Sequence, residues 1–126
     1  MSERPSATPV LRTVAMPADT NPDGDIFGGW IMSQMDLASG TFASQTVKGR
    51  VVTVAVDAMT FHKPVNVGDY LSCYCEVVRF GTTSLVIQVE SWVQRHHSEL
   101  FEKVTEGRFT FVAIDDQGKP RAIERK

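Results

Sequence analysis

The sequence predicts a single α+β domain in which one long helix packs on a curved antiparallel sheet of about five strands. Three observations support this prediction. The length of 126 residues suits one domain. Residues 26–47 form one long apolar stretch with helical spacing, and several strand-like segments follow it, separated only by short turns. Because strands joined by short turns pair antiparallel, the one helix must pack on the concave face of the resulting sheet.

The first part of the chain is expected to hold a tail, a first strand, a loop and the helix. Residues 1–9 lack periodicity and predict a loose tail, and residues 10–16 alternate weakly, as a first strand would. Residues 17–25 are dense in turn formers, which indicates an ordered loop. Within the helix at 26–47, apolar side chains lie on several sides, which is typical of a helix that is wrapped by protein.

The rest of the chain is predicted to form four strands and a polar tail. Residues 51–61 are apolar and β-branched almost throughout, so we expect a central strand that is covered on both faces. The later strands alternate between apolar and polar residues. These later elements are a strand at 70–80, a hairpin turn at 81–83, a strand at 85–94, a connection at 96–102, a last strand at 105–114 and a loose tail at 119–126. One domain therefore spans residues 1–126.

The outer face of this sheet carries two large apolar residues, Val86 and Trp92. A single helix cannot cover both faces of a sheet, so these residues are expected to be left open in one chain. We therefore predict a homo-oligomer in which other copies cover part of that surface.

The charge and cysteine content bound the partners and the compartment. A formal net charge of −2 produces no field that would attract nucleic acid or an anionic membrane, so we expect neither partner. The apolar stretch after Ile26 is too interrupted to span a membrane. Cys73 and Cys75 share one face of a predicted strand and are poorly placed to form a disulfide. With no secretory signal at the start of the chain, we expect reduced thiols and a cytoplasmic protein.

Asp36 is the only ionisable residue between Ile26 and Val47. A lone aspartate in a helix is most often a surface residue, but the neighbours of Asp36 are apolar or small, which favours a carboxylate at a wet cleft or an interface. Gly29 and Gly40 lie on the same stripe of the helix and leave room beside the carboxylate for a substrate.

The start of the same helix offers a second candidate group. Gly28 and Gly29 would present unpaired backbone N–H groups at the positive end of the helix dipole, which suits an oxyanion hole. A glycine pair at a helix start can also reflect backbone geometry alone. Gly29 and Asp36 are separated by ~10 Å along the helix axis, which is awkward for one substrate carbonyl. A site that takes its donors from one subunit and Asp36 from another would remove this difficulty.

Other polar residues give weaker signals. Asp25 either caps the turn before the helix or takes part in the chemistry, and the sequence leaves both alternatives open. His62, His96 and His97 have no metal-ligand spacing with a cysteine or a carboxylate, so we expect no metal. Neither a P-loop nor a Gly-x-Ser-x-Gly elbow is present, which disfavours nucleotide hydrolysis and a serine triad.

Several motifs follow one another in fixed order: NPDGDIFGGWIMSQMD, GRVVTVAVDAMTFHKPVNVGD, a GTTS turn and VESWV. From about Leu11 to Arg121 the sequence resembles the hot-dog-fold acyl-CoA thioesterases, most closely their bacterial single-domain YciA-like branch. The resemblance implies a central helix wrapped by the sheet, a dimer with one continuous sheet, and commonly a trimer of dimers. It also implies hydrolysis of acyl-CoA at sites between subunits, with coenzyme A as part of the substrate and as product and with no further cofactor.

The resemblance also implies roles for single residues. Asp36 matches the catalytic carboxylate, which acts as general base on water or as nucleophile on the thioester carbonyl. Gly28 and Gly29 match the donors that polarise the carbonyl, and Asp25 falls where relatives can carry a polar catalytic partner, often Asn. Phe27 replaces the histidine of relatives with a His-Gly-Gly signature and can only shape the pocket. Coenzyme A is expected along the segment after the helix, at Arg50, Val51, Val52 and Thr53, and along the later hairpin, at Gly81, Thr82, Thr83 and Ser84. Lys63 is a further expected contact.

Two other functions stay open on the sequence. In a non-catalytic acyl-CoA-binding or sensing module, Asp36 would only order water. A hydratase on the same fold would need a catalytic histidine paired with the acid, which the helix does not supply.

Overall fold

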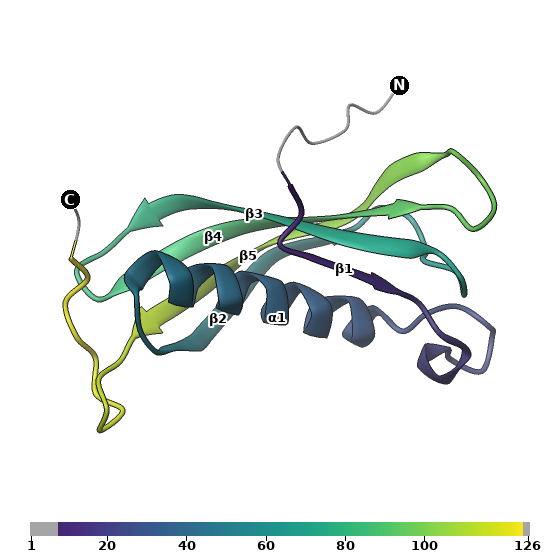
Figure 1. Ribbon diagram of the computed structural model, residues 1–126. Coiled ribbons are helices and arrows are strands. Elements are labelled where there is room, and N and C mark those ends of the chain that lie inside the picture. Colours follow the sequence, from purple (N-terminus) through teal and green to yellow (C-terminus); the bar gives the residue numbers. More distant parts are fainter. Residues whose placement is uncertain (1–7, 125–126) are drawn as a thin grey trace.

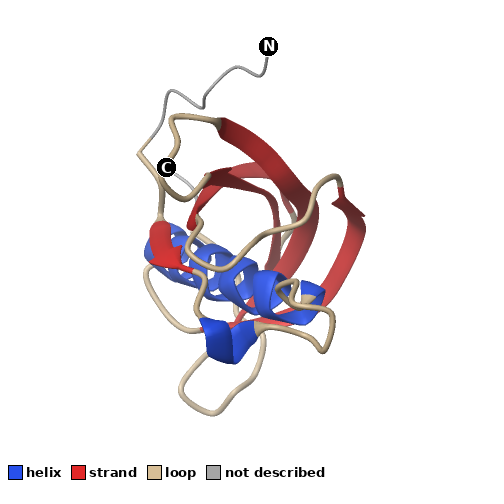
Figure 2. Ribbon diagram, turned by 90° about the vertical axis from the view of Figure 1, so that its right-hand side faces the viewer, coloured by secondary structure: helices blue, strands red, loops and turns tan. Residues whose placement is uncertain are grey.

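The computed structural model describes residues 8–124 and shows one helix lying along a five-stranded sheet (Figure 1). The strands are β1 (Leu11–Val14), β2 (Val51–Phe61), β3 (Tyr70–Phe80), β4 (Ser84–Gln94) and β5 (Phe101–Ala113). A short 3₁₀ helix, η1 (Pro17–Asp19), precedes the long helix α1 (Gly28–Val47). All neighbouring strands pair antiparallel, in the order β1-β3-β4-β5-β2, and the sheet curves round α1 (Figure 2). The predicted α+β fold is confirmed.

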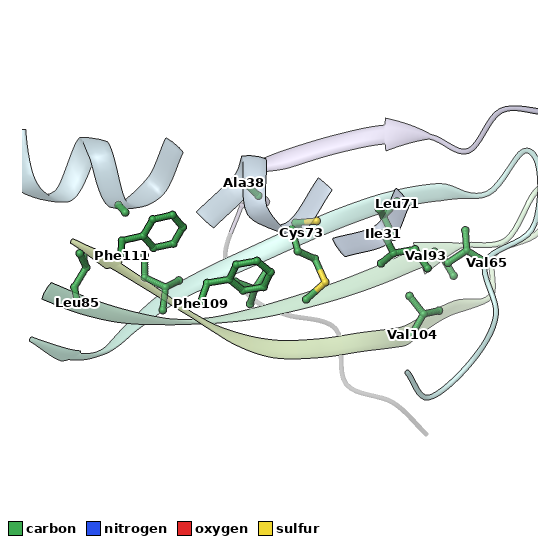
Figure 3. Close-up of a cluster of buried hydrophobic side chains, with 14 of the residues drawn as sticks. Ile31, Ala38, Val65, Leu71, Cys73, Leu85, Val93, Val104, Phe109 and Phe111 are labelled. Carbon is green, nitrogen blue, oxygen red and sulfur yellow. The ribbon is translucent and has the colours of Figure 1, made fainter. Parts of the chain in front are cut away.

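The core lies between α1 and the concave face of the sheet. Ile31, Met35 and Ala38 are separated by about one helical turn each, so they share one face, and all three are buried. They face the inward-pointing side chains of the strands, of which Phe109 and Phe111 are the largest (Figure 3). Burial of a side chain of this size contributes about 1.5–3 kcal/mol. This layer therefore holds α1 firmly on the sheet and fixes where its other faces point.

α1 ends at a residue in the left-handed conformation. Lys48 has a φ of 56°, which turns the chain back towards β2, and the Gly49 N–H donates to the Ser44 carbonyl at 3.1 Å. The Arg121 guanidinium donates to the Val47 carbonyl at 2.9 Å. A cation at this position also interacts favourably with the negative end of the helix dipole.

Residues 119–124 were expected to be part of a loose tail, but they are anchored on the domain. Ile123 is buried and its N–H donates to the Thr82 carbonyl at 2.9 Å, while the Arg121 N–H donates to the Ala113 carbonyl at 2.9 Å. One isoleucine and one arginine in a polar stretch produce no periodic pattern, so the sequence could not reveal this anchoring. Of the predicted tails, residues 1–7 and 125–126 lie outside the described part of the chain.

β2 is an edge strand, and the prediction of a central strand was wrong. Within residues 8–124 it pairs only with β5. Its valines Val52, Val54 and Val56 are 42, 54 and 37 % exposed. An uninterrupted apolar run is typical of a strand buried on both faces, but it fits equally well an edge strand that another chain covers. Periodicity alone does not separate these two cases.

Val86 and Trp92 were expected to be exposed on the outer face of a single chain, and this expectation was also wrong. Both residues are buried within the single chain. The Trp92 ring stacks on Phe101 with the ring centroids 5.3 Å apart, and its Nε1–H donates to the Glu90 carboxylate at 3.0 Å. Phe101 begins β5 ahead of the predicted start at 105, because the charged pair at 102–103 interrupts the apolar pattern of that strand.

Candidate active site

A groove of about 550 Å³ runs along α1 where the start of β2 passes beside the helix. The groove is lined by α1, by the turn that leads into β2, by β2 and by β5. The lining residues are Asp36, Leu37, Gly40, Thr41, Ser44, Gln45, Arg50, Val51, Thr53 and Phe111. Gly40 contributes by its small size, because it carries no side chain that could fill the space beside the Phe111 ring. The groove brings the candidate carboxylate together with three residues predicted to contact coenzyme A.

Asp36 lies on the exposed side of α1, and its Oδ1 accepts a hydrogen bond of 2.7 Å from Thr53 Oγ1. Thr53 can reach it because Thr53 pairs with Phe111 and so points to the same concave side of the sheet. Asp36 Oδ2 accepts no hydrogen bond from the described residues. A carboxylate held at one oxygen and free at the other can take a proton from water or attack a carbonyl carbon.

The backbone N–H groups of Gly28 and Gly29 have no acceptor among residues 8–124. The next two N–H groups along the helix donate to the carbonyl of Phe27, whose side chain caps nothing. Gly29 faces open space, and Gly28 lies beside the ring of Phe61. Two free donors at the positive end of a helix dipole can stabilise negative charge that develops on a carbonyl oxygen. We refer to Gly28 and Gly29 as the donor end of α1.

Within residues 8–124, the Asp25 side chain caps neither the turn nor the start of the helix, so the capping alternative was wrong. Asn21 closes this turn instead: its Oδ1 accepts the Asp25 N–H at 3.1 Å, and its own N–H donates to the Asp25 carbonyl at 2.7 Å. The sequence could not show which of the two Asx residues faces the turn, because both types favour it. The Asp25 carboxylate forms no hydrogen bond or ion pair within the described chain and lies on the exposed loop before the donor end. A catalytic role for it stays a prediction.

The other residues predicted to bind coenzyme A lie at the two ends of the domain. The hairpin 81–84 joins β3 to β4 near the end of α1 and the start of β2 (Figure 1). Lys63 follows the far end of β2 and forms an ion pair with Glu102. Val52 pairs with Val112 and takes the opposite side of the sheet from Thr53, outside the groove.

Five groove residues were not predicted, namely Leu37, Thr41, Ser44, Gln45 and Phe111. Polar residues at 41, 44 and 45 stand three or four positions apart in a largely apolar helix, so they share one face with the turn that carries Asp36. This spacing is the signal that could have identified the three polar residues.

Two further observations concern metal binding and the cysteine thiols. No three His, Cys, Asp or Glu side chains in the described part of the chain are grouped so that they could hold a metal ion. Burial raises the pKa of the Cys73 thiol to about 11 and that of Cys75 to about 12, so neither is a thiolate nucleophile near neutral pH.

No helix among residues 8–124 is long and apolar enough to cross a membrane.

Comparison with known proteins identifies the family to which this fold belongs. Residues 23–99 match the sequence profile of the Thioesterase superfamily. The chain is 53 % identical to the acyl-CoA thioester hydrolase YciA of Escherichia coli over 122 residues, which cover 94 % of this chain and 92 % of YciA. The hexameric thioesterase y2039 from Yersinia pestis has a TM-score of 0.93 at 50 % identity, covering 98 % of this chain and 100 % of that one. An aspartate-to-alanine mutant of HI0827, a hexameric broad-specificity acyl-coenzyme A thioesterase, has a TM-score of 0.91 at 48 % identity, covering 96 and 89 %.

One helix wrapped by an antiparallel sheet is the hot-dog fold, and a solved structure of this fold, the hexameric thioesterase Cj0915 of Campylobacter jejuni, has a TM-score of 0.90 at 44 % identity, covering 96 % of this chain and 93 % of that one. The chain belongs to the Thioesterase superfamily, and its resemblance to the YciA-like acyl-CoA thioester hydrolases is confirmed.

Proposed function

We propose that this protein hydrolyses acyl-CoA thioesters to free coenzyme A and a carboxylic acid, with water as the acceptor and without a metal. The observation that carries the proposal is the Asp36 carboxylate, held at one oxygen by Thr53 and free at the other, in a groove along α1. The similarity to proteins named as acyl-CoA thioester hydrolases supports the choice of substrate class.

Asp36 can act on the thioester in two ways. As a general base, it takes a proton from water while the water oxygen bonds to the carbonyl carbon. As a nucleophile, it bonds to that carbon itself and expels the coenzyme A thiolate, and water then cleaves the resulting anhydride. In both cases the carbonyl oxygen gains negative charge that the Gly28 and Gly29 N–H groups stabilise. The C–S bond breaks after water has added in the general-base route and as the anhydride forms in the nucleophilic route. In both routes the sulfur becomes the thiol of coenzyme A with a proton that water ultimately supplies.

The complete site would combine two subunits, because one helix does not bring both groups to one carbonyl. Gly29 and Asp36 are ~10 Å apart along the axis of α1. The uncovered edge of β2 suits antiparallel pairing with β2 of a second copy. Such pairing places the start of one β2, which carries Thr53, next to the end of the other, where Phe61 lies against Gly28. The carboxylate of one subunit would then face the donor end of its partner.

The minimal active unit in this proposal is a homodimer, and three such dimers would form the full assembly. The hexameric state given for several relatives of the same fold supports a trimer of dimers. A hexamer contains three dimers and hence six sites. Each site would combine the donor end of one subunit with the Asp36 carboxylate of its dimer partner.

Coenzyme A would lie along the start of β2 and the hairpin 81–84. Arg50 is exposed there, and within residues 8–124 its guanidinium makes only long contacts of 3.4 and 3.5 Å to the carbonyls of Asp115 and Asp116. It is therefore free to bind a phosphate group, for which a guanidinium is well suited. Lys63 is already paired with Glu102 and would contribute less.

Thiol release from a panel of short, medium and long acyl-CoAs tests the proposed function. The wild-type protein should release one thiol for each acyl-CoA consumed, and the ratio of kcat to KM across the panel would define the preferred chain length. Binding of acyl-CoA without release of thiol would instead identify a binding or sensing module and refute the proposal.

Thr53→Val should lower kcat about tenfold with little change in KM. The substitution keeps the shape of the side chain but removes the hydroxyl that orients the Asp36 carboxylate, and a hydrogen bond to a charged group contributes about 1.5–3 kcal/mol. Steady-state thiol release measures the effect. Thr110→Val, on the neighbouring strand β5 outside the groove, serves as the control and should keep wild-type kinetics. Unchanged kcat in Thr53→Val would show that Asp36 does not need this partner.

A further inference from the structure

A buried carboxylate organises the loop between β2 and β3. Asp69 is only 2 % exposed, and its two oxygens accept hydrogen bonds from the backbone N–H groups of Asn66 at 2.9 Å and His96 at 3.0 Å. Its main partner is the Arg95 guanidinium, whose NH1 lies 2.6 Å from Asp69 Oδ2. A buried charge is costly unless it is paired and fully hydrogen-bonded, and Asp69 meets both conditions.

Arg95, at the end of β4, connects this loop to β5. Its NH1 also donates to the carbonyl of Pro64 at 2.9 Å, and its Nε donates to Glu102 at 2.9 Å. Glu102 in turn pairs with Lys63. Hydrogen bonds from Lys63 and Arg95 hold the pKa of Glu102 below its usual range, so it is ionised at neutral pH. One guanidinium thus holds the loop 62–69 at two points and ties it to the sheet.

The same loop holds the segment that leads into α1. Val65, directly after Pro64, is fully buried, and its carbonyl accepts the Ile26 N–H at 3.2 Å. Ile26 stands two residues before Gly28. The next residue, Phe27, is held from the other side by the Asp19 carbonyl, which accepts its N–H at 3.1 Å. The direction of the donor end therefore depends on where the loop holds Val65.

We propose that Arg95 is a positioning residue for catalysis: it fixes the loop 62–69 and, through the Val65 carbonyl and the Ile26 N–H, the direction of the Gly28 and Gly29 donors. The inference rests on the proposed function. Arg95 lines no part of the groove and contacts no reacting atom. Its effect would arise from geometry, since a displacement of about 1 Å at a catalytic group can cost about a hundredfold in rate.

Arg95→Met tests this role in the full-length assembled protein. Methionine keeps much of the side-chain volume but leaves Asp69 and the Pro64 carbonyl without their partner. We expect kcat to fall 10- to 100-fold at 25 °C with KM within about twofold, because the donors act on the charge that develops in the transition state. Amide hydrogen exchange should become faster at Ile26, whose bond to Val65 would loosen.

Three further variants separate positioning from general destabilisation. Arg95→Lys should restore part of kcat, because an ammonium group can pair with Asp69 but cannot hold Pro64 and Glu102 as well. Glu102→Gln keeps the Arg95 contacts to the loop and should stay near wild-type kcat. Val89→Ala makes a cavity in the middle of β4, away from the loop, and should lower the Tm without changing kcat or the exchange of Ile26.

Wild-type kcat together with wild-type exchange at Ile26 in Arg95→Met would overturn the proposal. If Arg95→Met does not fold, the same two results in Arg95→Lys would overturn it. An inactive wild-type protein would refute the proposed function instead, and the exchange of Ile26 in the variants would still decide whether Arg95 holds the start of the helix.

Discussion

Asp36→Asn is expected to lower kcat for acyl-CoA hydrolysis by about a thousandfold. Asparagine has nearly the same shape, and its amide oxygen can still accept the hydrogen bond from Thr53. It is not a base at neutral pH and is a poor nucleophile, so either mechanism open to Asp36 would fail, and general-base catalysis alone typically contributes 10²- to 10⁴-fold. Steady-state thiol release with the preferred acyl-CoA measures the loss.

Asp57→Asn is the matched control for this substitution. Asp57 is an exposed carboxylate on β2 that stands opposite Arg108 in the strand register, and it lies outside the groove. The same chemical change there should leave the kinetics unaltered. Circular dichroism and gel filtration should show wild-type fold and assembly for both variants. Wild-type turnover in Asp36→Asn would refute the assignment of Asp36.

Val54→Asp should break the assembly and reduce kcat/KM by more than about a hundredfold. Val54 is the most exposed of the β2 valines and sits at an irregularity in the pairing with β5. Antiparallel pairing with a second β2 would bury it, and an unpaired charge in such an interface costs several kcal/mol. Analytical ultracentrifugation at micromolar concentration should show monomers, and thiol release should fall with the loss of the partner's donor end.

Leu100→Asp controls for the added charge. Leu100 is also 54 % exposed, but it lies in the connection between β4 and β5, away from the edge of β2. This variant should stay assembled and active. A Val54→Asp protein that is monomeric yet fully active would contradict a site between subunits, whereas one that stays assembled would contradict pairing through β2.

The parts of the fold that could be predicted are those with long periodic patterns. The helix was expected in the apolar stretch 26–47, with Gly28 and Gly29 at its start, and is found at Gly28–Val47. The bounds of β2 and β3 also agree with prediction. The position of β2 in the sheet could not be predicted, because an apolar run carries no information on which strand lies beside it. The anchoring of Ile123 depends on one residue and left no pattern in the sequence.

The candidate site could be predicted where a residue departs from its surroundings. Asp36 stood out as a lone carboxylate in an apolar helix, and the structure places it in the groove. Its hydrogen bond with Thr53 could not be foreseen, because it depends on the register between β2 and β5 and on how α1 crosses them. The contacts of Arg95 could not be predicted, because Pro64 and Asp69 come near it only through folding. The role of Asn21 could not be predicted for another reason, since Asp25 in the same turn is of an equally suitable type.

The uncovered edge of β2 also has a consequence for how the protein must be produced. A strand of eleven residues with exposed valines and free backbone groups is a template for aggregation until another chain covers it. Newly folded chains would therefore be exposed to two competing second-order processes, productive pairing and misassembly, whose rates both rise with concentration. We expect the yield of active protein to depend on how fast pairing occurs relative to synthesis, so slow expression at low temperature should favour it.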